Sequence, residues 1–110
     1  DEKAVPILID LLEDEEPNIR WDAAIGLAKM GNKSGVYVIE NLLDRSYLNE
    51  FPEIDEQEKT KALMVAIEVS SILMDKKFQS RLVSLAESDK NLKIRDAAIK
   101  TLQSTYNISI

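Results

Sequence analysis

The chain has 110 residues, of which 45% are hydrophobic and 31% charged, and its formal net charge is −6. A chain of this length buries one modest core, so a single domain is expected. Cysteine and histidine are both absent, which excludes disulfides, thiolate or imidazole metal ligands, and catalysis by a cysteine or histidine. The longest apolar run, residues 62–67, is far shorter than the roughly 20 residues that cross a bilayer.

The two halves of the chain differ in charge. Residues 1–58 carry 15 acidic and 5 basic side chains, net −10, whereas residues 59–110 carry 5 acidic and 9 basic side chains, net +4. No signal peptide is recognisable, which favours a cytoplasmic protein, and no cofactor is expected. The first residue is Asp1 rather than a methionine, so a targeting segment or membership of a longer repeat protein stays open.

The first 31 residues predict two helices joined by an acidic turn. In residues 4–14 the hydrophobic positions have the spacing of one helix face: Val5, Leu8, Ile9 and Leu12. Pro17 suits the first position of a second helix, and Gly31 with Asn32 ends it. The hydrophobic stripe expected on the second helix is Ile19, Ala23, Leu27 and Met30.

This helical pair is repeated along the chain. "SGVYVIENLLDR" repeats the first helix at an offset of 31 residues, and "FQSRLVSLAESD" is a third copy of it. "NLKIRDAAIKTL" matches the second helix at an offset of 75, which aligns Arg95 with Arg20 and Ala98 with Ala23. The middle copy is longer because of an insertion at residues 45–58. There Asp55 and Glu58 have the spacing of a capping pair that starts a long helix.

The segment "AVPILIDLLEDEEPNIR", followed by "AAIGLAKMG", closely resembles a HEAT repeat, in particular the short type first associated with phycobilisome lyases. That resemblance implies an all-α fold, a right-handed α-solenoid of three antiparallel helical hairpins with second helices on the concave side. The units would span about residues 1–31, 32–75 and 76–110. It also implies a structural ladder, hydrogen-bonded across the turns of adjacent repeats, of Asp14, Arg20, Asp89 and Arg95.

Several kinds of chemistry fit the residues poorly. The carboxylates of residues 13–16 fan outward from a turn, so they do not converge on a metal ion. Nucleic-acid binding through the basic C-terminal half is disfavoured, because the only aromatic residues there are Phe78 and Tyr106 and the protein is acidic overall. No catalytic residue is identified, so we expect a protein that is not an enzyme.

Trp21 and Ile25 stand where the last copy of the motif has the charged residues Asp96 and Lys100. Tryptophan is enriched at interface hot spots, so Trp21, Ile25 and Lys29 are the candidate protein-binding residues. The alternative is that the apolar pair packs on the long helix or on a neighbouring repeat.

The insertion combines aromatic and acidic residues, and its Tyr47, Phe51 and Glu53 form a candidate secondary contact. Alternatively, its apolar side chains fold back over the middle hairpin.

These observations predict a non-enzymatic scaffold or adaptor that binds a protein or peptide through the concave face formed by the second helices. The acidity of the insertion favours a partner with a basic segment. An accessory subunit of a phycobilin lyase is the alternative, and it rests on the resemblance alone.

Overall fold

The computed structural model describes residues 2–110, and the molecule measures 39 × 32 × 17 Å along its principal axes. Within these residues the chain contains α-helices and short 3-10 helices but no strand. The helices are α1 (Ala4–Leu11), α2 (Pro17–Lys29), η1 (Lys33–Gly35), α3 (Val36–Leu42), α4 (Arg45–Leu48), α5 (Glu56–Leu73), η2 (Lys76–Phe78), α6 (Gln79–Ser88) and α7 (Leu92–Ser104).

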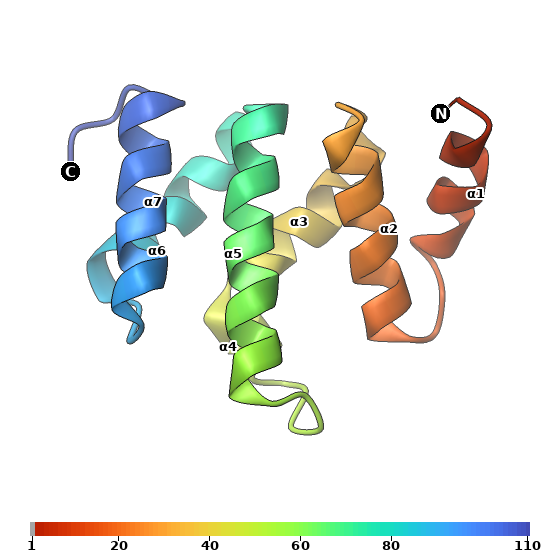
Figure 1. Ribbon diagram of the computed structural model, residues 1–110, viewed down its shortest axis with the longest axis horizontal. Coiled ribbons are helices and arrows are strands. Elements are labelled where there is room, and N and C mark those ends of the chain that lie inside the picture. Colours follow the sequence, from red (N-terminus) through yellow and green to blue (C-terminus); the bar gives the residue numbers. More distant parts are fainter. Residues whose placement is uncertain (1) are drawn as a thin grey trace.

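The helices form two layers. Figure 1 shows α2, α5 and α7 side by side in front, with α3, α4 and α6 behind them and α1 at the edge next to α2. The packing follows the chain order, because α1 packs on α2, α3 on α2 and α5, and α6 on α7. Helical hairpins stacked in this way form an all-helical α-solenoid, as predicted.

The boundaries of α2 follow from its terminal residues. Pro17 occupies the first turn, where its missing N–H is not needed. At the other end Gly31 has a φ of 75°, and the backbone N–H groups of Gly31 and Asn32 donate to the carbonyls of Ala28 and Leu27. This is a Schellman motif, which satisfies carbonyls that the helix would otherwise leave without donors.

Polar caps start the later helices. The Asp55 carboxylate accepts the backbone N–H of Glu58 at 2.9 Å, so the predicted capping position of α5 is confirmed. The Asn91 side chain accepts the N–H groups of Lys93 and Ile94 and starts α7 in the same way.

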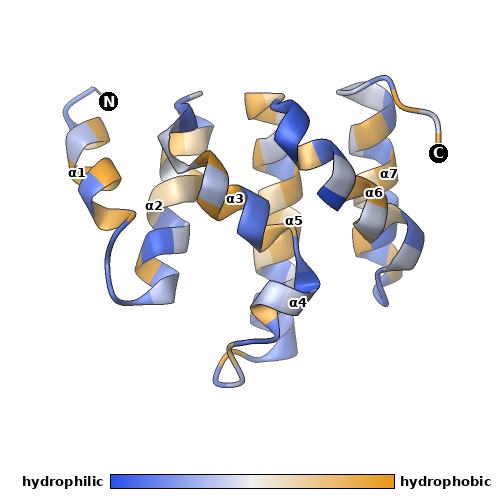
Figure 2. Ribbon diagram, turned by 180° about the vertical axis from the view of Figure 1, so that it is seen from behind, coloured by the Kyte–Doolittle hydropathy of each residue, from blue (hydrophilic) through white to orange (hydrophobic). Residues whose placement is uncertain are grey.

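The hydrophobic core runs through all the hairpins. The central helix α5 is in contact with α2, α3 and α7, which explains the buried residues on several of its faces. The fully buried large side chains include one from nearly every helix, among them Leu27, Ile39, Leu48, Leu63, Leu82 and Leu102. Seen from behind in Figure 2, hydrophobic and hydrophilic residues alternate along α3 and α6, as expected for helices covered on one side.

The predicted stripe of α2 is only partly buried. Ala23 and Leu27 are buried, but Ile19 and Met30 are 39% and 38% exposed. Helix α1, which packs on α2, is short and has no buried residue of its own. The outer part of the stripe therefore remains open.

Candidate protein-binding groove

A groove of about 350 Å³ opens between α2 and α5, on the face formed by the second helices. We call it the α2–α5 groove. Its lining from α2 is Asn18, Trp21, Asp22, Ile25 and Lys29, and its lining from α5 and the preceding residues is Ile54, Glu58, Lys61, Ala62 and Val65. The three residues predicted to bind protein therefore lie together in one hollow.

The groove has an apolar floor and a polar rim. Ile25, Ala62 and Val65 are half-buried and pack against the core, so each still presents part of its side chain to the hollow. The five polar and charged lining residues are all exposed: Asn18, Asp22, Lys29, Glu58 and Lys61. An apolar centre surrounded by a wet polar rim is the usual composition of a protein interface.

Trp21 was expected to be an exposed anchor residue, but it is buried. Its side chain belongs to the core, with 5% of the residue exposed, so only one edge of it reaches the groove. The ring makes edge-on contacts with Tyr47 and Phe51, at centroid distances of 6.2 and 5.3 Å, and the indole N–H donates to the Tyr47 hydroxyl. Trp21 is a structural residue beneath the groove.

The motif that contains Trp21 and Ile25 on α2 has charged residues at the matching positions of its second copy on α7, and the packing of the two helices explains this difference. On α7 these positions are Asp96 and Lys100, which are exposed and form an ion pair at 3.1 Å. Helix α7 packs on α5 and α6, which precede it, and within the described residues no later helix covers this face. Trp21 stands between neighbouring units, so it is apolar, whereas Asp96 stands on an outer face and is charged.

The insertion covers this inner position. Leu48 and Ile54 are buried, and Tyr47 and Phe51 pack against the core and against each other at 5.2 Å. The interpretation in which the apolar side chains fold back is therefore the one that the structure supports. Glu53 is exposed near the tip of the insertion and is separate from this aromatic cluster.

The arginines of the predicted ladder lie on α2 and α7 and have different partners from those expected. Arg20 donates to the backbone carbonyls of Asp14 and Glu15, at 2.8 and 3.2 Å, and Arg95 donates to the carbonyl of Ala86. Arg20 thus binds the α1–α2 turn and Arg95 the C-terminal end of α6, so both arginines bind within their own units instead of crossing to an adjacent repeat. The expectation that they span neighbouring repeats was wrong.

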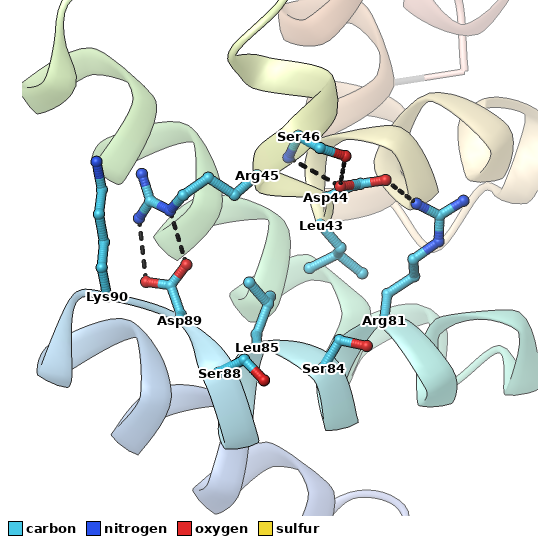
Figure 3. A pocket seen from close by; sticks show the side chains of 10 residues that line it. All are labelled: Leu43, Asp44, Arg45, Ser46, Arg81, Ser84, Leu85, Ser88, Asp89 and Lys90. Atoms are coloured by element: carbon cyan, nitrogen blue, oxygen red, sulfur yellow. Dashed lines mark hydrogen bonds and ion pairs between the residues drawn. The ribbon is translucent and has the colours of Figure 1, made fainter.

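Two other arginines bind across neighbouring units, so the ladder in this structure consists of the ion pairs Arg45–Asp89 and Arg81–Asp44. Arg45 binds Asp89 through Nε at 2.7 Å and through its terminal nitrogen at 3.1 Å, and Arg81 pairs with Asp44. Figure 3 shows both pairs on the wall of a 420 Å³ hollow between the α3–α4 turn and α6. They join the middle unit to the last one.

Hydrogen bonds and charge stabilise both aspartates of the ladder in the ionised form. Burial opposes ionisation of Asp89 most strongly, but the hydrogen bonds from Arg45 and from the backbone N–H of Asn91 outweigh it and lower its pKa. Burial likewise opposes ionisation of Asp44, and the hydrogen bonds from Ser46 together with the charge of Arg81 lower its pKa. The Asp89 partner raises the pKa of Arg45.

The sequence contained one signal for these pairs that the repeat alignment missed. Asp14, Asp44 and Asp89 each accept the backbone N–H two residues later, so all three end a first helix in the same way. Aligning these three turns, rather than the helices alone, would have placed Asp44 and Arg45 beside Asp89.

The described residues contain no group of three or more acidic, histidine or cysteine side chains arranged to hold a metal ion. Across the same residues 2–110, every helix is too short or too polar to cross a membrane.

The architecture defines an α-solenoid, a repeat protein built from stacked helical hairpins. The family model described as HEAT repeats matches residues 1–49, which hold the first unit and the start of the second. Residues 1–49 therefore resemble HEAT repeats in sequence, and the later hairpins stack on them in the same all-helical arrangement. The match does not distinguish the phycobilisome-lyase type. No curated protein and no solved structure matched the chain.

Proposed function

We propose that this α-solenoid protein is a non-enzymatic scaffold that binds a protein or peptide segment in the α2–α5 groove. HEAT repeats commonly serve as surfaces for protein interaction, and this supports the general role. The observation that carries the specific proposal is the composition of the groove. Its half-buried Ile25, Ala62 and Val65 leave an apolar floor open inside an exposed polar rim.

The lining residues also favour binding over catalysis. Besides apolar side chains, the groove contains one amide, two carboxylates and two lysines, and the chain has no histidine or cysteine. Asp22 and Lys29 are two helical turns apart on α2, which is about 10 Å, so this carboxylate and lysine do not form an acid–base pair.

Ala62→Phe tests the proposal, because a larger side chain fills the floor of the groove. Ala97→Phe is the matched control, since Ala97 is also half-buried on a second helix but lies outside the groove. Each immobilised protein is incubated with extract of the native cells, and the retained proteins are compared by mass spectrometry. We expect at least one protein to be retained by the parent and by Ala97→Phe and lost with Ala62→Phe.

Circular dichroism checks that both variants are folded. If Ala62→Phe fails to fold, Asn18→Trp replaces it. Asn18 is exposed on the rim, and a tryptophan at this position would block the mouth of the groove. Identical sets of retained proteins for the parent and a folded groove variant would contradict the proposal.

A further inference from the structure

We infer that the α2–α5 groove binds a segment with one apolar anchor residue and lysine or arginine residues on one side of that anchor. The inference rests on the proposed function and adds the chemical nature and the polarity of the partner. It is carried by the distribution of charge around the groove.

The floor of the groove accepts an apolar side chain. Ala62 is the smallest of the floor residues, and it lines the groove together with the buried Trp21 and Ile54 and with Val65, one turn further along α5. The hollow measures about 350 Å³, near the lower end of the range for small-ligand pockets. It therefore suits one or two side chains of a segment lying across α2 and α5.

One end of the groove is strongly acidic. Asn18 and Glu58, both in the first turn or so of their helices, line the same hollow, so the N-terminal ends of α2 and α5 are neighbours. Six exposed carboxylates surround this end: Glu15, Glu16, Asp22, Glu53, Asp55 and Glu58. Within residues 2–110 none of the six forms an ion pair.

Local positive charge does not neutralise these carboxylates. Two helix N-termini contribute about half a charge each, and the Arg20 guanidinium, bound to the nearby turn, contributes one more. With the neighbouring Lys59 also counted, an excess of about three negative charges remains at this end. A partner segment with lysine or arginine would find complementary charge there.

The other end of the groove has the opposite character. Lys29 lies there, at the C-terminal end of α2, whereas Lys61, one turn beyond Glu58 on α5, lies nearer the middle of the groove. Both lysines are exposed and form no ion pair in the described part of the chain. A segment that is basic along its whole length would be repelled here, so the cationic residues belong on one side of the anchor.

Fluorescein-labelled peptides test this inference by fluorescence anisotropy. The first probe has a block of lysines followed by one leucine among glycines, and a second has the reverse order. In two matched peptides either the lysines are replaced by glutamate or the leucine by glycine. We expect one of the two leucine–lysine peptides to bind most tightly, and at least about tenfold more tightly than its glutamate counterpart.

The charge contribution is isolated by a pair of double variants. Asp22→Asn with Glu58→Gln removes two carboxylates of the groove, whereas Asp10→Asn with Glu87→Gln removes two exposed carboxylates elsewhere and changes the net charge equally. Rim pairs contribute modestly, so we expect the first double variant to weaken binding about three- to tenfold and the control to leave it unchanged. Raising the salt concentration weakens binding to the parent more than to the first double variant.

Equal binding of the lysine and glutamate peptides, or equal loss with both double variants, would overturn the inference. If Ala62→Phe still abolished retention of a cellular protein in that case, the proposed function would stand without this partner chemistry. If no peptide bound and the parent self-associated in sedimentation while Ala62→Phe did not, the occupant would be a second copy of the chain, which would also overturn the inference.

Discussion

The indole N–H of Trp21 donates a hydrogen bond to the hydroxyl oxygen of Tyr47 at 3.2 Å, and this bond joins α2 to the insertion 26 residues later. The same indole is in edge-on contact with Phe51. The insertion is thereby attached to the first hairpin by an aromatic cluster, at the position where two neighbouring units meet.

Truncating the indole is expected to destabilise the protein. Trp21→Ala leaves a cavity in the core, so the free energy of unfolding in urea should fall by about 3–5 kcal/mol. Tyr47→Phe keeps the ring and removes only the acceptor, so its cost should be about 1 kcal/mol. In the parent the fluorescence of the single tryptophan should show a buried emission maximum without quenching by iodide. Efficient quenching, or an unchanged stability of Trp21→Ala, would show that the indole is exposed instead.

Substitution by alanine is expected to change the stability of the protein in opposite directions at Gly35 and at Gly26. A Cβ atom on Gly35 would stand 3.0 Å from both the Cα and the Cβ of Ala24, so the backbones of η1 and α2 would have to separate. On Gly26 it would meet only the end of the Leu8 side chain, at 3.5 Å. Gly35→Ala should therefore destabilise by about 1–3 kcal/mol. Gly26→Ala, inside a helix, should stabilise by up to about 1 kcal/mol. Melting curves of the two variants measure the contrast, and a shift of the same sign in both would contradict it.

The sequence predicted local structure well because its signals are local. Pro17, Gly31 and Asp55 mark helix ends through their own backbone preferences or caps, and each occupies the predicted position. The repeat offset also revealed the all-helical solenoid.

The side-chain partners could not be predicted in this way. Whether Trp21 faces solvent depends on where the insertion folds, and nothing within one turn of α2 specifies that. The partner of Asp89 is likewise Arg45, 44 residues earlier, in the part of the chain where the repeat pattern is interrupted. Ile25 and Lys29, two of the predicted binding residues, line the α2–α5 groove together, whereas Trp21, the expected anchor, is buried.

The two ion pairs of the ladder should differ in their contribution to stability. The side chains of Arg45 and Asp89 are 13% and 1% exposed, whereas those of Arg81 and Asp44 are 34% and 32% exposed. Asp89→Asn keeps an acceptor for the Asn91 N–H but removes the charge that faces Arg45. Its cost should be about 2 kcal/mol, since Glu56 at 3.3 Å still accompanies Arg45. Arg81→Gln should cost less than about 1 kcal/mol. Equal losses in urea unfolding would show that burial does not distinguish the two pairs.

The lowered pKa of Asp89 predicts how the stability that Asp89 contributes depends on pH. Because its pKa is lower in the folded than in the unfolded chain, ionised Asp89 contributes stability that is fully present above the unfolded pKa of about 3.9. That contribution is lost as the pH falls through the lower folded pKa, where the carboxyl becomes protonated in both states. Asp89→Asn has no such group.

The difference in unfolding free energy between the parent and Asp89→Asn should therefore be constant between about pH 5 and 7 and should shrink below about pH 4. Measuring both proteins at each pH cancels the relief of repulsion that protonation brings to the many carboxylates of residues 1–58, because the two chains share all of them. Arg81→Gln provides the control for the rest of the ladder, since it leaves Asp89 and Arg45 in place. A difference that persisted undiminished down to about pH 2 would mean that the ionised form of Asp89 is not what stabilises the contact with Arg45.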